Sequence, residues 1–316
     1  MRILVIGGTG HIGSFLTPML VADGHTVTVI TRGERKPLDA AQGLRPLANR
    51  AWESVKLLTG VYKRNDPAFA ALVGSVGAEV VVDILGAQVP AIYDAVKGKA
   101  KHLIACGSVW MLGTPRVVPT PPEEQSPCPF DWYGMRWREL NETRARAAKD
   151  GVAFTAVLPP NICGPGKVPI DVKGGRDVEV HKSVMRGEPV VLPEHCNTLI
   201  APCDASDVAH PFALAVKNRD AAAGEFFNAG SPCALSARRF VEVYAEIFGV
   251  KVPIDWIPAP KFYGEYLPDV GSNYHFSTHM APDISKTRAK LGYAPEFTSE
   301  QSMARAVAWM REKGLM

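Results

Sequence analysis

A run of glycines close to the N-terminus has the spacing needed to bind a phosphate chain. The run is Gly7-Gly8-Thr9-Gly10-His11-Ile12-Gly13, between a predicted strand at residues 2–6 and a predicted helix at residues 11–23. In such a turn Gly7 permits the tight bend, Gly10 lets the backbone approach a pyrophosphate, and Gly13 lets the helix pack against the strand. Unpaired N–H groups at the helix N-terminus favour the negative charge of the phosphates. We therefore predict a dinucleotide-binding turn made by Gly7, Thr9, Gly10, His11, Ile12 and Gly13.

The residue expected to face the adenosine ribose favours one dinucleotide over the other. An NAD site usually carries a carboxylate about twenty residues after the glycines. This chain has Arg32 there, followed by Arg35 and Lys36. A guanidinium suits the 2′-phosphate of NADP(H) through a charge-assisted hydrogen bond, and the alternative interpretation is a solvated surface arginine. The sequence predicts NADP(H) as the cofactor, with NAD(H) less favoured.

The elements that must position this turn alternate between short apolar runs and longer amphipathic ones, which is typical of a parallel sheet between helices. Predicted strands lie at residues 2–6, 25–30, 54–58, 79–85, 102–106 and 153–158, and several are apolar on both faces. Asp66-Pro67 predicts the start of a helix at 68–76, and Gly151 ends a long helix at 132–150. Pro18 lies inside the first predicted helix and predicts a kink there.

The second half of the chain has a different pattern. From about residue 164, loops rich in Pro and Gly separate weaker strands at 190–192 and 225–228, and capped helices begin at Ser236, Asp283 and Thr298. We expect an α/β protein: a doubly wound parallel Rossmann sheet at 1–165, rejoined by about 200–231, and a smaller C-terminal α/β substrate domain at 166–316. The proline-rich segment 113–130 is predicted to be an extended loop that covers a pocket.

Composition excludes several classes of protein. The 316 residues are 47% hydrophobic and 21% charged with a net charge of +3, as in globular proteins, and the basic residues are not clustered. These properties argue against nucleic-acid and membrane-surface binding, and no run approaches the ~20 apolar residues of a membrane span. The six cysteines form no CxxC pair, and His195-Cys196 with Cys203 and His210 matches no standard metal spacing. We expect a cytoplasmic protein with reduced cysteines and no metal.

Several motifs, in their order along the chain, are similar to those of the NAD(P)-dependent epimerase/dehydratase family, the extended or atypical short-chain dehydrogenase/reductases. They are GGTGHIG at 7–13, VVDILG at 81–86, Gly107-Ser108, Tyr133-Gly134, PNICGPG at 160–166, Asp207-Val208-Ala209, DISK at 283–286 and LGY at 291–293. The resemblance covers nearly the whole chain. It implies a homodimer, and it implies further cofactor contacts from Asp83, Leu85, Gly86, Pro160 and Ile162.

The same resemblance implies a catalytic set with one departure. Members of the family use a Ser or Thr, a Tyr, and a Lys four residues after the Tyr. Ser108 and Tyr133 match, but Trp137 holds the lysine position, and Asn141 holds the position of the family's glutamate. A tyrosine, with its ordinary pKa of ~10, moves a hydroxyl proton well only when a nearby positive charge favours the phenolate. An indole carries no charge; Arg136, roughly on the helical face of Tyr133, is the nearest candidate cation.

Aromatic residues around this tyrosine predict a pocket wall suited to stacking on a sugar ring. The candidates on the substrate side are Trp110, Trp137, Asn161 and His181. The resemblance implies an NADP(H)-dependent oxidoreductase or epimerase/dehydratase that acts at a secondary alcohol or ketone of a sugar-like or nucleotide-sugar substrate. Tyr133 would transfer the proton and Ser108 would bind the substrate oxygen, with Arg136 beside them. The alternative is a non-catalytic dinucleotide-binding protein that senses redox state.

Overall fold

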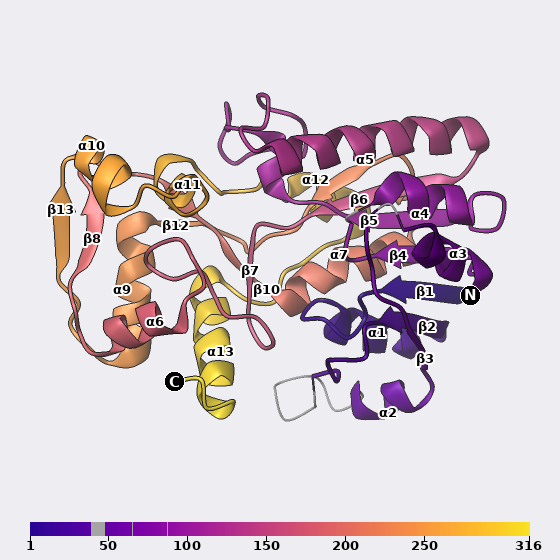
Figure 1. Ribbon diagram of the computed structural model, residues 1–316, viewed down its shortest axis with the longest axis horizontal. Coiled ribbons are helices and arrows are strands. Elements are labelled where there is room, and N and C mark those ends of the chain that lie inside the picture. Colours follow the sequence, from indigo (N-terminus) through magenta and orange to yellow (C-terminus); the bar gives the residue numbers. More distant parts are fainter. Residues whose placement is uncertain (39–47, 65, 87) are drawn as a thin grey trace.

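A seven-stranded parallel sheet forms the centre of the first domain (Figure 1). The computed structural model describes residues 1–38, 48–64, 66–86 and 88–316. The strand order is β11-β6-β5-β4-β1-β2-β3, and every pairing is parallel. The strands are β1 Arg2–Ile6, β2 Thr26–Thr31, β3 Lys56–Thr59, β4 Val80–Asp83, β5 His102–Cys106, β6 Ala153–Leu158 and β11 Phe226–Asn228. The order reverses between β1 and β4, where an open α/β sheet forms its ligand crevice.

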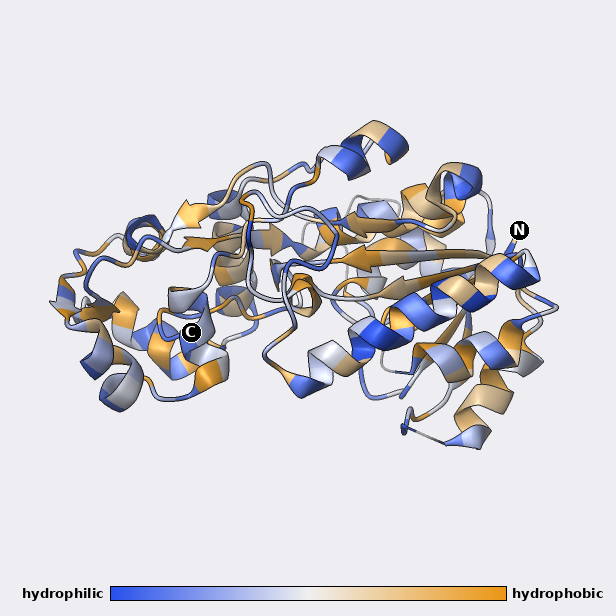
Figure 2. Ribbon diagram, turned by 90° about the horizontal axis from the view of Figure 1, so that it is seen from above, coloured by the Kyte–Doolittle hydropathy of each residue, from blue (hydrophilic) through white to orange (hydrophobic). Residues whose placement is uncertain are grey.

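Helices cover both faces of this sheet because its strands are apolar on both faces. They are α1 Gly13–Ala22, α2 Ala48–Glu53, α3 Pro67–Ser75, α4 Val89–Val96, α5 Asp131–Asp150, α7 Ala205–Lys217, α8 Arg219–Ala222 and α12 Ser285–Leu291. Ile3 and Val5 of β1 pack in a core with α1 and α7, whereas Leu4 and Ile6 pack in a second core with α3, α4 and α5. Figure 2 shows hydrophobic central strands and helices of mixed hydropathy around them. The predicted doubly wound parallel sheet is confirmed.

The second domain is smaller and has its own core. Its helices are α6 Val178–Met185, α9 Ala237–Phe248, α10 Ala259–Lys261, α11 Val270–Ser277 and α13 Ser299–Glu312. Its strands pair as β8 Val190–Pro193 with β13 Ile254–Ile257, β9 Leu199–Ile200 with β12 Leu235–Ser236, and β7 Asn161–Cys163 with β10 Pro202–Asp204. Phe240, Phe262 and Met303 are completely buried among these elements. The chain returns to the first domain through α7 and β11, and α12 also packs there.

Several local details bear on the sequence predictions. Helix α1 continues through Pro18 as one element. The proline-rich segment 113–130 is held by backbone hydrogen bonds from Thr120 N to Ala281 O and from Gln125 N to Leu112 O, of 2.7 and 2.8 Å. All six cysteines have free thiols. Within the described residues, no helix is both long and apolar enough to cross a lipid bilayer.

Candidate active site

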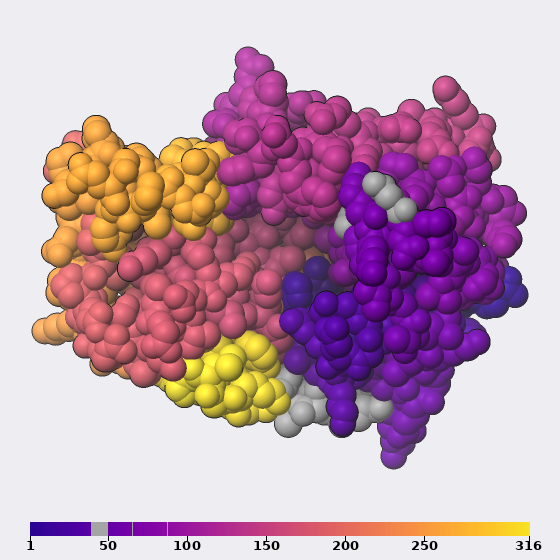
Figure 3. All heavy atoms as spheres, viewed as in Figure 1, coloured from indigo at the N-terminus to yellow at the C-terminus, as the bar shows by residue number. Residues whose placement is uncertain are grey.

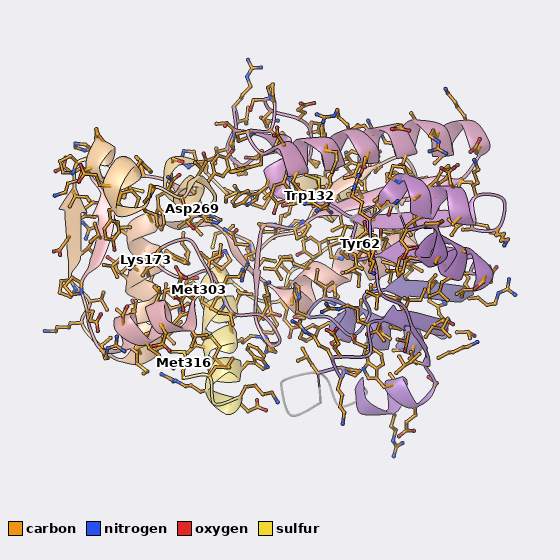
Figure 4. The ribbon with its side chains drawn as sticks, viewed as in Figure 1. Tyr62, Trp132, Lys173, Asp269, Met303 and Met316 are labelled. Atoms are coloured by element: carbon orange, nitrogen blue, oxygen red, sulfur yellow. The ribbon has the colours of Figure 1, made fainter. Side chains whose placement is uncertain are left out.

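A cavity of about 720 Å³ opens at the carboxyl ends of β1, β4 and β5, where the strand order reverses. Both domains contribute to its wall, and Figure 3 shows the hollow between the indigo-to-purple residues and the pink ones. Tyr62, labelled in Figure 4, lines it from the segment between β3 and α3. No described residue of the segment 113–130 lines this cavity, so the prediction that this loop covers the pocket is wrong. Its hydrogen bonds to Leu112 and Ala281 hold it elsewhere.

The glycine turn forms one end of the cavity. Gly7 has a positive φ of 85°, and its carbonyl accepts a hydrogen bond of 3.0 Å from Gly10 N. A Cβ added to Gly10 would meet only Gly7 O, at 3.2 Å, so a ligand can approach the backbone closely there. Gly13 does not line the cavity; a Cβ on it would lie 2.4 Å from Gly8 Cα, so it serves the contact between α1 and the turn. Gly7, Thr9, Gly10, His11 and Ile12 do line the cavity.

The end of β2 forms the rim beside this turn. Thr31 Oγ1 lies 2.7 Å from Thr9 Oγ1 and ties β2 to the glycine turn. Arg32 lines the cavity, and its Nη2 lies 3.0 Å from Glu34 Oε2 in an ion pair whose side chains are 55% and 63% exposed. An ion pair this exposed contributes ~0–1 kcal/mol. A ligand phosphate can therefore displace Glu34 at little cost.

Ser108 and Tyr133 belong to the part of the cavity wall beyond β5, and each contacts Trp110. Ser108 Oγ accepts a 3.2 Å hydrogen bond from Trp110 N, which begins the short 3-10 helix Val109–Leu112. This bond uses a lone pair and leaves the hydroxyl hydrogen for a ligand. Tyr133, in the first turn of α5, packs against Trp110 with ring centroids 5.5 Å apart. Ser108, Trp110 and Tyr133 all line the cavity.

Two cations lie close enough to Tyr133 to influence its pKa. Burial raises the pKa of Tyr133, while Arg136 and Arg176 act in the opposite direction. Arg136 lines the cavity, but it is anchored: Nε donates to Gly86 O at 2.9 Å and Nη2 to Cys106 O at 3.0 Å. It also lies over the ring of Trp132, at the end of α5 nearest the second domain (Figure 4). Arg136 thus braces the ends of β4 and β5 while presenting a fixed positive charge.

Two predicted substrate-side residues lie outside the cavity wall. Trp137 is only 8% exposed, packs against Phe226 at 5.2 Å between ring centroids, and donates from Nε1 to Glu124 Oε2 at 3.1 Å. His181 is buried against Tyr244, and its Nε2 lies 3.2 Å from Pro169 O. Neither belongs to the described residues that line the cavity. Their burial against Phe226 and Tyr244 favours a structural role for both rings, and their contact with substrate stays a prediction.

Of the predicted cofactor residues after β4, one lines the cavity and two hold the turn behind it. The Asp83 carboxylate accepts hydrogen bonds from Leu85 N and Gly86 N, at 3.1 and 3.0 Å. Burial raises the pKa of Asp83 to about 6, opposed by those N–H groups and Arg136. Leu85 lines the cavity, whereas Asp83 and Gly86 lie behind it and hold the turn that carries Leu85. After β6, Pro160, Asn161 and Ile162 line the cavity.

The lining residues that were not predicted include Lys167 and Arg176, from the loop after β7, and His275, on α11. His275 is 4% exposed and its ring lies 5.1 Å from that of Trp110. Within the described part of the chain, His11 Nε2, Asn161 Nδ2 and His275 Nδ1 are buried without hydrogen-bond partners. Buried polar atoms are usually hydrogen-bonded, so these three atoms indicate where a polar ligand would bind.

Replacing Trp137 with Phe tests its assignment to the core. The variant keeps the ring contact with Phe226 but removes the donor to the Glu124 carboxylate, which belongs to an exposed residue and can be rehydrated by water. We therefore expect the free energy of unfolding to fall by ~0.5–1.5 kcal/mol, the net contribution of one hydrogen bond. Substrate KM should stay within twofold of wild type. Chemical denaturation and steady-state kinetics measure the two quantities. A large rise in KM without a loss of stability would show that Trp137 contacts the substrate.

A doubly wound sheet with a glycine turn after β1 and a Ser–Tyr pair beyond β5 defines a dinucleotide-binding α/β protein of the short-chain dehydrogenase/reductase type. The sequence model of the NAD dependent epimerase/dehydratase family matches residues 3–230. The chain therefore belongs to this family.

Several known proteins are similar to the chain over nearly its whole length. The chloroplast stem-loop binding protein of 41 kDa b from Arabidopsis thaliana is 26% identical, over 94% of this chain and 75% of its own. The UDP-glucose 4-epimerase of Corynebacterium glutamicum is 25% identical, over 94% and 92%. The solved UDP-glucose 4-epimerase of Bifidobacterium longum, in complex with NAD+ and UDP, has a TM-score of 0.74 at 16% identity and covers 100% and 99% of the two chains. This last likeness shows the fold alone.

Proposed function

We propose that this protein uses NADP(H) to oxidise or reduce a secondary alcohol or ketone of a nucleotide-sugar or sugar-like substrate. Epimerisation and dehydration through a transient keto intermediate fall within this chemistry. One observation carries the proposal: a single cavity has the glycine turn at one end and the side chains of Ser108 and Tyr133 in its wall. The family and its sugar-nucleotide relatives support the substrate class. On the same resemblance we propose a cytoplasmic homodimer.

The residues present fit a dinucleotide. The open face above Gly10 allows close approach of a pyrophosphate, and His11, Asn161 and His275 offer buried polar atoms without protein partners. The volume of about 720 Å³ is within the usual range of ligand sites, about 300–1,000 Å³. The backbone of the turn would hold the pyrophosphate, with Leu85 and Ile162 against the rest of the ligand. When bound, the nicotinamide supplies a hydride donor or acceptor.

The chain's own residues then supply orientation and proton transfer. Ser108 donates its hydroxyl hydrogen to the substrate oxygen and orients it. The Tyr133 oxygen accepts the hydroxyl proton during oxidation and returns it to the oxygen during reduction. Arg136 and Arg176 favour the phenolate electrostatically. Because Arg136 is fixed by Gly86 O and Cys106 O, its charge acts from a constant position.

The proposed function is tested by measuring whether the purified protein converts a substrate in the presence of a nicotinamide dinucleotide. Purified protein is incubated with NADP, NADPH, NAD or NADH and a panel of nucleotide sugars, free sugars and ketones. Absorbance of the reduced nicotinamide reports net oxidation or reduction, and NMR of the sugar reports epimerisation or dehydration. We expect at least one nucleotide sugar to be converted. The raised pKa of Tyr133 and the absence of a lysine at position 137 favour a second candidate, a dinucleotide sensor, and tight cofactor binding without conversion of any substrate would select it.

Replacing Arg32 with Ala tests the preference for NADP(H). Losing a charge-assisted hydrogen bond of ~1.5–3 kcal/mol should raise the Kd for NADP by about 10–100-fold and change the Kd for NAD by less than about threefold. Isothermal titration calorimetry measures both constants. Glu34→Gln is the matched control: it frees Arg32 from its ion pair and should tighten NADP binding. Equal losses of NADP and NAD affinity in the Arg32 variant would refute the 2′-phosphate contact.

A further inference from the structure

The loop between β7 and α6 brings the second domain directly against the glycine turn. At Gly166 the backbone has a positive φ of 87°, and a Cβ added there would lie 3.4 Å from the Cβ of His11. The next residue, Lys167, donates from its backbone N to Gly164 O at 3.0 Å, which closes a tight turn at this point. The side chain of Lys167 therefore starts beside the turn that includes Gly7 and Gly10, and it lines the same cavity.

Positive charge dominates this part of the cavity. The described lining residues include the five basic side chains of Arg32, Arg35, Arg136, Lys167 and Arg176, against the one carboxylate of Glu34. Glu34 pairs with Arg32 at 3.0 Å. Within the described part of the chain, neither Lys167 nor Arg176 has a carboxylate oxygen within 4.0 Å. Partly buried charges without a counter-charge are costly, so the pair indicates a site for an anion.

The protein around these two cations offers little compensation. Arg176 donates from Nη1 to Val168 O, a neutral acceptor. The nearby carboxylate of Asp171 accepts backbone hydrogen bonds from Lys173, Gly175 and Asp177, at 2.7, 3.1 and 2.8 Å. Burial, followed by Arg176 and Arg35, lowers the pKa of Lys167 to about 8. Burial, Lys167, Arg176 and Arg35 lower the pKa of His11 to about 3, so this ring is neutral at pH 7.

We propose that Lys167 and Arg176, with Arg35, form a clamp that closes over the pyrophosphate of the dinucleotide from the side opposite the glycine turn. The inference rests on the proposed function, which places a dinucleotide in this cavity. The backbone N–H groups of the turn hold the pyrophosphate from the first domain, and the ammonium and guanidinium groups neutralise its two charges from the second. The bound cofactor then joins the two domains, and the clamp slows its release.

The test compares ligands that share adenosine but differ in pyrophosphate. ADP-ribose and AMP are titrated into wild type, Lys167→Met and Arg176→Met by calorimetry, and UDP is titrated into the NADP-loaded proteins. We expect Kd for ADP-ribose to rise at least tenfold in each variant, while Kd for AMP and UDP changes less than threefold. Lys173→Met is the matched control, because Lys173 is exposed on the same loop, outside the cavity wall (Figure 4). It should bind ADP-ribose as wild type does.

Other results of these titrations would refute either the clamp or the proposed function. If the variants lose UDP affinity and keep ADP-ribose affinity, the cations bind a substrate phosphate and the clamp is refuted. Unchanged ADP-ribose affinity in both variants, together with turnover of a nucleotide sugar by the wild-type protein, refutes the clamp and leaves the proposed function standing. If the wild-type protein binds ADP-ribose but converts no substrate of the panel, the proposed function is refuted and the clamp still stands. Melting temperatures of the ligand-free variants within about 3 °C of wild type show that both remain folded.

A second measurement separates an electrostatic clamp from simple packing. Lys167 faces Arg176, Arg35 and the neutral His11, and its pKa of about 8 in the ligand-free protein means that the charge is lost as pH rises through 8. Pyrophosphate binds the charged form, so affinity for ADP-ribose should fall about tenfold between pH 7 and pH 9.5. Lys167→Arg keeps its charge over this range and should show no such fall. The same pH profile in wild type and in Lys167→Arg would overturn the proposal.

Discussion

Replacing Tyr133 with Phe is expected to lower kcat by about 10²–10⁴-fold, the usual contribution of a positioned general acid or base. Dinucleotide affinity should stay within about twofold, because the phenol oxygen, not the ring, performs the proposed transfer. Phe can keep the contacts of the ring with Trp110 and Phe130, whose centroids lie 5.5 and 6.3 Å away. The measurement is kcat on the substrate identified by the panel, with the Kd for NADP measured in parallel.

Tyr274→Phe is the control for this substitution. Tyr274 also packs against Trp110, with centroids 5.2 Å apart, but it does not belong to the described cavity wall. Its variant removes a hydroxyl near the same indole and should change kcat by less than about threefold. If Tyr133→Phe retained more than a tenth of the wild-type kcat, the proton would have to be transferred by another group.

The pH profile follows from the same residue. Burial raises the pKa of Tyr133 above its ordinary value, and Arg136 and Arg176 only oppose this shift. Below that pKa the phenolate fraction grows tenfold for each pH unit, so the rate of alcohol oxidation should rise between pH 7 and pH 10. A flat wild-type profile over this range would show that deprotonated Tyr133 does not limit the reaction.

Much of the fold could be predicted because its signals are local. Strand β1 agrees with prediction at both ends, and the apolar character of both its faces requires helices on both sides of the sheet. The glycine turn could also be predicted, since its glycines, the preceding strand and the following helix lie within about twenty consecutive residues. At the sheet edge the boundary differs from the prediction, because β3 begins at Lys56 instead of residue 54.

The cavity wall could be predicted only in part, because it depends on contacts between distant segments. Trp137 lies four residues after Tyr133 on α5, but its ring packs against Phe226 and not in the cavity. Lys167 and His275 contribute from the second domain, and no local pattern shows that their loops reach the glycine turn or Trp110. The density of glycine and basic residues at 164–176 was the one available signal for Lys167 and Arg176.

Replacing two glycines of the same turn with Ala should have different effects, one on dinucleotide binding and the other on stability. At Gly10 the added Cβ meets only Gly7 O, at 3.2 Å, and otherwise points into open space. Gly10→Ala should therefore fold normally but weaken dinucleotide binding about tenfold or more, equal to about 1.4 kcal/mol or more. Gly13→Ala places its Cβ 2.4 Å from Gly8 Cα and 2.5 Å from Gly8 C, which only a shift of α1 can relieve.

The expected cost of Gly13→Ala is about 3 kcal/mol of unfolding free energy, the upper part of the usual range for overpacking. Ala has a higher helix propensity than Gly by about 1 kcal/mol, so a net loss can only come from the clash with Gly8. The melting temperature should fall by about 6–12 °C, at about 2–4 °C for each kcal/mol. Gly264→Ala is the control, since an added Cβ there meets nothing within 4 Å. A Gly13→Ala protein as stable as wild type would mean that α1 does not rest on the glycine turn, and the turn would then lack the support that holds its N–H groups toward a pyrophosphate.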